Sequence, residues 1–115
     1  MTNEINTFRS LYNLQFKYLQ SIACERSVDA SSDGTYQITL VLSRYDDIYP
    51  KKMRMVFEGA IDVKIGDING LWGMLIDIED IKNNGLENIY FIVREIEYDT
   101  FSFMCKSFNT ELIFD

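Results

Sequence analysis

Carboxylates are the side chains of this sequence with the most capacity for chemistry, and they are unevenly distributed. Residues 1–66 carry eight acidic and eight basic side chains, whereas residues 67–115 carry ten acidic side chains and three basic ones. The whole formal net charge of −7 therefore falls in residues 67–115. Such a field attracts basic proteins and repels nucleic acids and anionic membranes. The pattern predicts a basic protein partner, with binding to neither nucleic acid nor membrane.

Clustered carboxylates can also hold a metal ion or act as a catalytic acid–base pair. A calcium-binding EF-hand loop that started at Asp80 would place Lys82 at its third position and Phe91 at its twelfth, where a glutamate is required. The cluster of Asp77, Glu79 and Asp80 is better interpreted as a solvated acidic loop. Glycosidase chemistry would need two carboxylates in unlike surroundings, and no pattern distinguishes one acid from another. We expect no metal site.

Nucleophilic and imidazole-based chemistry lacks its usual residues. The sequence contains no histidine, the commonest general base at neutral pH and a usual metal ligand. Cys24 and Cys105 are too few for a structural zinc site. Nucleotide-binding glycine motifs and the nucleophile-elbow motif are also missing from the sequence. We therefore expect no catalytic residue and no cofactor, so that the protein is not an enzyme, and we expect both thiols to be free and buried.

The length and composition predict one globular domain over residues 1–115, with 47% apolar and 25% charged residues. Residues 1–4 have neither the basic flank nor the apolar segment of a signal peptide. No apolar run approaches the ~18 residues that a membrane span needs. Because the two thiols are expected to be free, we predict a cytoplasmic location.

Alternating apolar and polar residues dominate the sequence, which is the pattern of half-buried strands. Gly59 interrupts one long alternating segment and predicts a bend or bulge there. Helix-like spacing occurs in residues 3–13. Short turns between the strands favour an antiparallel meander. We predict a mainly β protein, with α+β as the alternative class, that forms a sandwich or half-open barrel with a short N-terminal helix. The expected strands cover residues 16–24, 36–43, 53–65, 72–79, 89–98 and 101–108.

The last two strands can be aligned if Asp99 and Thr100 form a two-residue turn, which makes Ile96 face Phe103 and turns Arg94 inward. The opposite face would then combine acids with Ile89, Phe91 and Val93. The N-terminal helix, a second sheet or a protein partner would cover that apolar patch with its acidic rim. The predicted core consists of Ile38, Leu40, Phe57, Trp72, Met74, Ile76, Ile96 and Phe103.

Spaced strands, acids and aromatic residues recur in a particular layout over about residues 53–108. The layout is formed by the runs 55–61, 75–81, 85–90, 95–97 and 101–105. It resembles small acidic bacterial immunity proteins that neutralise polymorphic or contact-dependent toxins. The resemblance implies a cytosolic protein, encoded beside a toxin, that covers the active site or another surface of that toxin. Many such toxins are basic nucleases. The resemblance supplies no functional residue that can be carried over individually.

We therefore predict an immunity protein that binds a cognate toxin, expected to be a basic nuclease, through an acidic surface. A general protein-interaction or assembly module, which could form a homodimer, is the first alternative. A small carboxylate-based enzyme or a ligand-binding β-barrel is the second alternative. The candidate partner-binding residues are the acids of residues 77–99: Asp77, Glu79, Asp80, Glu87, Glu95, Glu97 and Asp99.

Overall fold

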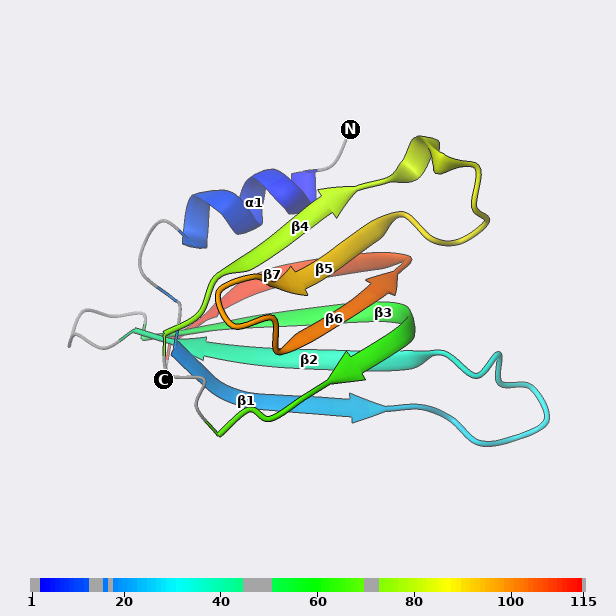
Figure 1. Cartoon of the computed structure of the whole chain (residues 1–115), viewed down its shortest axis with the longest axis horizontal. Helices are drawn as coiled ribbons and strands as arrows, with labels where there is room; N and C mark the ends of the chain where they lie inside the picture. The colour runs from blue at the N-terminus through cyan, green and yellow to red at the C-terminus, as the bar shows by residue number, and fades with distance from the viewer. Residues whose placement is uncertain (1–2, 13–15, 17, 45–50, 70–72, 115) are drawn as a thin grey trace.

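Antiparallel strands and one N-terminal helix form the protein, for which the computed structural model describes residues 3–12, 16, 18–44, 51–69 and 73–114 (Figure 1). The mainly β class with a short helix is therefore confirmed, and the sheet is not closed into a barrel. The elements in chain order are α1 (Asn3–Tyr12), β1 (Tyr18–Glu25), β2 (Tyr36–Ser43), β3 (Lys52–Ile65), β4 (Ile76–Asp80), the 3₁₀ turn η1 (Lys82–Asn84), β5 (Phe91–Glu95), β6 (Phe101–Cys105) and β7 (Ser107–Ile113).

The long strand β3 bends at Gly59 and belongs to two layers. Its first half lies between β2 and β7, and its second half pairs with β6. Gly59 has φ +65°, and a Cβ atom there would lie 3.0 Å from the Cβ of Lys106. Lys106 separates β6 from β7, and its backbone N–H donates a hydrogen bond of 3.0 Å to the carbonyl of Glu58. The predicted bend is confirmed. At the bend β3 passes from one layer to the other, and it pairs with β7 before the bend and with β6 after it.

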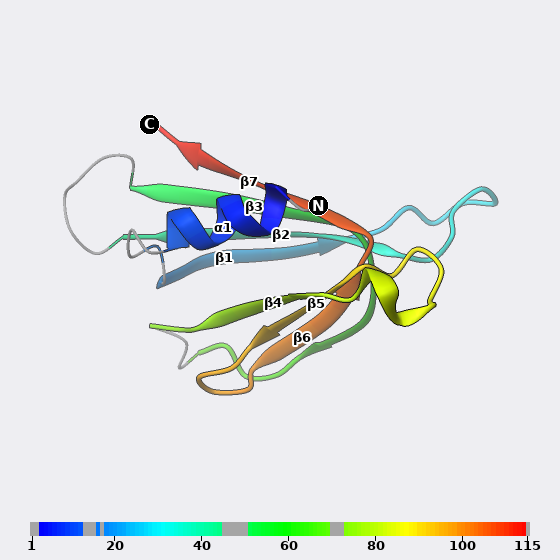
Figure 2. The same ribbon diagram turned by 90° about the horizontal axis from the view of Figure 1, so that it is seen from above.

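Figure 2 shows the strands in two layers, and the buried apolar core includes the aromatic residues Phe57, Phe103 and Phe108. One layer contains β1, β2, β7 and the first half of β3, and the other contains β4, β5, β6 and the second half of β3. Phe57 of the first layer meets Phe103 of the second edge to face, with ring centroids 5.0 Å apart. The helix α1 lies along one side, beside β7, and buries Ile5 and Phe8. Burial of these apolar surfaces is the main force that holds the layers together.

Most of the predicted core is correct. Ile38, Leu40, Phe57, Met74, Ile76 and Phe103 are all buried. Ile96 is wrong, because 55% of it is exposed, and Trp72 lies outside the described residues. The expected strand 72–79 begins only at Ile76, and the expected strand 89–98 ends at Glu95. The last expected strand is divided into β6 and β7, and β7 continues to Ile113.

The predicted alignment of β5 with β6 is also wrong. Arg94 lies opposite Ser102, and Val93 opposite Phe103, because residues 96–100 form a longer loop than a two-residue turn. The shift is by an odd number of residues, so every β5 side chain changes face. Phe91 and Val93 are consequently buried, and the layer of β1, β2, β7 and the first half of β3 covers them: the ring of Phe91 meets that of Phe108 in β7, with centroids 5.1 Å apart. Arg94 is exposed instead of inward-facing.

The two thiols differ in their surroundings. Both cysteines are free, as expected. Cys105 is buried, but Cys24 is exposed, which corrects the expectation that both are buried. Among the described residues, no helix combines the length and apolar character required to cross a membrane.

Candidate functional site

The acids proposed for partner binding come from the layer of β4, β5 and β6 and its loops. Asp77, Glu79 and Asp80 lie on the edge strand β4, which pairs only with β5 among the described strands. Glu87 lies in the connection from β4 to β5, and Glu97 and Asp99 lie in the loop from β5 to β6. These two connections are at opposite ends of the layer (Figures 1 and 2). The six acids therefore spread along one layer instead of forming one compact site.

Glu95, the seventh acid, is fully buried, and the expectation that it lies on the acidic surface is wrong. Its carboxylate accepts backbone hydrogen bonds from Glu97 at 2.8 Å, Tyr98 at 3.1 Å and Thr100 at 3.1 Å. The backbone N–H of Leu75 approaches the same group at 3.5 Å. Hydrogen bonds of this kind compensate for the burial of a polar group. Glu95 therefore stabilises the loop after β5, and neither of its carboxylate oxygens is exposed to solvent.

The loop built by Glu95 presents apolar side chains to solvent. Ile96 is 55% exposed and Tyr98 is 60% exposed. Two neighbouring segments lie against this loop through backbone hydrogen bonds of 2.8 Å, from Ile96 N–H to the Leu75 carbonyl and from Gly66 N–H to the Thr100 carbonyl. We call the exposed apolar residues of these three segments the loop patch; they are Ile65, Leu75, Ile96 and Tyr98. The loop patch is not the patch expected at Ile89, Phe91 and Val93: Phe91 and Val93 are covered by the other strand layer, and the sequence did not predict the loop patch.

Basic side chains neutralise part of the acidic layer. Arg94 forms an ion pair of 3.5 Å with Glu79, and Lys82 forms one of 3.9 Å with Asp80. All four side chains are well exposed, so these pairs add little stability. No ion pair joins any of the other four surface acids to another described residue; these are Asp77, Glu87, Glu97 and Asp99. Among the acids proposed for partner binding, these four are exposed or partly exposed and have no described basic partner.

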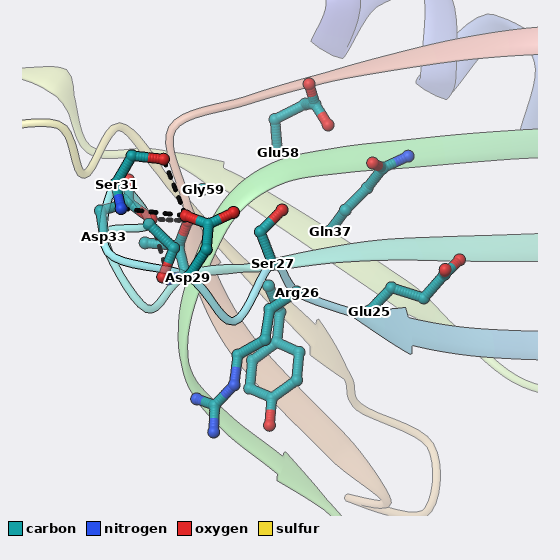
Figure 3. Close-up of a pocket in the computed structure, with 12 residues that line it drawn as sticks. Glu25, Arg26, Ser27, Asp29, Ser31, Asp33, Gln37, Glu58 and Gly59 are labelled. Carbon is teal, nitrogen blue, oxygen red and sulfur yellow. Dashed lines mark hydrogen bonds between the residues drawn. The ribbon is translucent and has the colours of Figure 1, made fainter.

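A second acidic region, which the sequence analysis did not identify, lines an open depression of about 560 Å³ at the β1–β2 loop (Figure 3). Asp29 accepts hydrogen bonds from the backbone N–H of Ser31 at 2.9 Å and from its hydroxyl at 2.7 Å. Asp33 does the same with Thr35, at 3.0 Å and 2.7 Å. These hydrogen bonds lower the pKa of both carboxyl groups. The two carboxylates are therefore engaged in shaping their own loop.

The other charged groups of this depression are one arginine and two glutamates. The Arg26 guanidinium lies over the Tyr36 ring, 4.7 Å from its centroid. Glu25 and Glu58 complete the acidic lining. Within the part of the chain that the structure describes, no group of three or more histidine, cysteine or acidic residues is arranged to hold a metal ion. Three of the four acids, Glu25, Asp29 and Asp33, lie close together in the sequence, but the zero net charge of residues 1–66 as a whole concealed them.

Comparison with known protein families identifies a match over almost the whole chain. A family model of the immunity protein PIM8 matches residues 1–111, which is almost the whole chain and more than the stretch 53–108 that carried the resemblance. Neither the curated proteins nor the solved structures contain a match. Immunity proteins act by binding a cognate toxin, which agrees with the expectation that the chain is not an enzyme. The chain belongs to the PIM8 immunity protein family.

Proposed function

We propose that this protein neutralises its cognate toxin in the cytoplasm by binding it through the acidic layer, and that the toxin is a basic nuclease. The family accounts for a toxin as the partner. The observation that carries the more specific proposal is the charge, since all seven units of net negative charge belong to residues 67–115. That part of the sequence forms most of the layer of β4, β5 and β6.

The physical argument starts from the substrate of a nuclease. A nuclease must bind phosphates, and arginine and lysine side chains are the residues that do so. Carboxylates on a partner form charge-assisted hydrogen bonds with the same side chains and accelerate the encounter through long-range attraction. Asp77, Glu87, Glu97 and Asp99 are available for this role because no described basic residue pairs with them.

The proposal is tested first with the product of the gene adjacent to this one, purified as an inactive variant for binding and as the active protein for nuclease assays. We expect a stable complex by size-exclusion chromatography and loss of nuclease activity when the immunity protein is added in equal amount. A toxin that binds but degrades no nucleic acid would contradict the nuclease assignment. A gene product that does not bind would contradict the proposed function.

The contribution of the acidic layer is tested with two variants of equal net charge. The test variant combines Glu87→Gln, Glu97→Gln and Asp99→Asn, and the control combines three exposed acids of β1 and β3, Glu25→Gln, Glu58→Gln and Asp62→Asn. Asp99 and Asp62 both have positive φ, 55° and 53°, which asparagine also tolerates. We expect the test variant to associate more slowly at low salt and with a weaker salt dependence, whereas the control stays close to the wild type. Equal association rates for the two variants would show that only net charge matters.

A further inference from the structure

Of the eight large apolar residues that are well exposed in the described part of the chain, four form the loop patch, and the other four are Val28, Ile68, Leu86 and Phe114. Single exposed apolar side chains are normal on protein surfaces, but a contiguous group marks an interface. Val28 and Leu86, exposed to 87% and 50%, lie in separate loops at the other end of the molecule from the β5–β6 loop (Figures 1 and 2). The loop patch, in contrast, collects four exposed apolar residues from three segments that backbone hydrogen bonds hold together.

The loop patch also has a fixed shape before any partner arrives. The buried Glu95 carboxylate receives the N–H groups of Glu97, Tyr98 and Thr100, so the backbone of the β5–β6 loop is held from inside. An interface built on an ordered loop loses less conformational entropy on binding than one built on a flexible loop. Tyrosine suits such a position, because it buries a large apolar ring at a small entropic cost and carries a hydroxyl group.

The charges around the loop patch indicate what it can bind. Glu97 and Asp99 flank Tyr98, and Asp67 follows Gly66 on the neighbouring segment. No ion pair engages these three acids within the described residues. Lys64 precedes the exposed Ile65 and is the nearest basic residue in the sequence of that segment. A partner that matches this surface has an apolar recess surrounded by arginine and lysine side chains.

We propose that the loop patch is the element that docks the toxin, with Tyr98 as its apolar anchor and Glu95 as a positioning residue that holds Tyr98 in place. The inference rests on the proposed function and deepens it. It assigns the centre of the interface to apolar and aromatic contacts, whereas the acids of the layer contribute attraction at the rim. Aromatic residues in the centre of an interface carry most of the binding free energy in general.

The first test measures the affinity of Tyr98→Ala and Ile96→Ala for the purified, inactive product of the adjacent gene, with Val28→Ala and Leu86→Ala as controls. All four residues are at least half exposed, so each variant is expected to fold. We expect Tyr98→Ala to weaken binding at least about 30-fold, mainly through faster dissociation, and both controls to bind within a factor of about two of the wild type.

The second test separates positioning from simple structural support. Glu95→Gln replaces one of the two carboxylate oxygens by an NH2 group, which cannot accept hydrogen bonds from the N–H groups of the loop. We expect the amides of Glu97, Tyr98 and Thr100 to exchange at least about tenfold faster with solvent, while the amides of β2 and β3 keep their protection. In a double-mutant cycle with Tyr98→Ala, the loss of affinity from Glu95→Gln should be smaller than in the wild type. Additive losses would refute the positioning role.

The outcomes distinguish failure of the proposed function from failure of the docking assignment. If the wild-type protein does not bind the gene product, the proposed function fails and the docking assignment fails with it. If the wild type binds and Tyr98→Ala binds equally well, only the docking assignment is overturned. If Tyr98→Ala instead converts a dimer of this chain to a monomer, as seen by light scattering, with unchanged toxin affinity, the loop patch is a homodimer contact and the docking assignment is again overturned.

Discussion

The buried carboxylate of Glu95 determines how the chain passes from β5 to β6. A buried carboxylate is costly unless hydrogen bonds replace its hydration, and backbone N–H groups from the following loop provide them. To donate these bonds, residues 96–100 must fold back over the end of β5, which a two-residue turn would not allow. The position of one side chain therefore explains both the longer loop and the exposure of Ile96 and Tyr98.

Two residues that were expected to form a cross-strand pair should respond very differently to truncation. Phe103 is 2% exposed and packs against Phe57, whereas Ile96 is 55% exposed. We expect Phe103→Ala to lower the free energy of unfolding by about 3–5 kcal/mol and Ile96→Ala to change it by less than about 0.5 kcal/mol. Chemical denaturation of both variants measures this difference. Equal losses would mean that Ile96 is buried and that the five-residue loop is incorrect.

The two free thiols should react differently in the native protein. Burial raises the pKa of the Cys105 thiol to about 12, and partial desolvation raises the pKa of Cys24 to a smaller extent. Because the thiolate is the reactive form and Cys24 is the exposed thiol, we expect a thiol reagent to modify Cys24 in the native state and Cys105 only after unfolding. Peptide mapping of the labelled protein identifies the modified residue. Labelling of native Cys105 would contradict its burial.

The raised pKa of Cys105 also predicts the direction of an alkaline effect on stability. The fold favours the neutral thiol, so this contribution is fully present below the ordinary pKa of 9.0 and is lost as the pH rises toward about 12. We expect the free energy of unfolding to fall over that range, and to fall less steeply in Cys105→Ala. Tyrosine and lysine groups titrate in both proteins, so the difference between the two curves isolates the thiol. Parallel curves would contradict the assignment.

At the scale of the elements, strand periodicity predicted β2 and most of β3 because each has one buried and one exposed face. It could not decide the face of β5. Apolar residues occupy Phe91 and Val93 at odd positions but Ile92 and Ile96 at even ones, so both alignments bury apolar side chains. The correct alignment buries a charged residue, Glu95, which periodicity counts as exposed. The predicted strand 101–108 ended before most of β7 for a similar reason, since Asn109, Thr110 and Glu111 form a polar run that does not show strand periodicity.

The bend in β3 gives a prediction with a matched control. Gly59 and Gly34 have φ of +65° and +81°, but an added Cβ at Gly59 would lie 3.0 Å from the Lys106 Cβ, whereas Gly34 has nothing within 4 Å. Backbone strain alone should cost about 1–2 kcal/mol in Gly34→Ala. Gly59→Ala should lower the free energy of unfolding by more, because the added methyl group would also force the backbone at Lys106, between β6 and β7, to move away from β3. Denaturant unfolding measures both losses, and equal losses would mean that the contact with Lys106 is not limiting.

At the scale of the whole molecule, the charge of the sequence predicts that residues 67–115 attract a basic partner, but it does not select individual residues. The four acids that have no ion pair among the described residues could not be distinguished from Glu79 and Asp80, because ion pairing with Arg94 and Lys82 depends on the strand alignment and on loop geometry. The depression at the β1–β2 loop was missed because charge was summed over all of residues 1–66, although three of its four acids lie within residues 25–33. A count of charges along the chain therefore predicts the overall electrostatic field of the molecule, but it does not predict which residues make up each surface.

The uncompensated acids should also affect the stability of the free protein. Asp77, Glu87, Glu97 and Asp99 belong to one layer with few basic residues, so their mutual repulsion opposes folding. We expect the variant with Glu87→Gln, Glu97→Gln and Asp99→Asn to have a melting temperature equal to or higher than that of the wild type at low salt. The difference should shrink as salt is added, because salt screens exposed charges. A melting temperature that falls at low salt would mean that these acids form stabilising contacts in the fold, and a weaker association of this variant with the toxin could then no longer be attributed to charge alone.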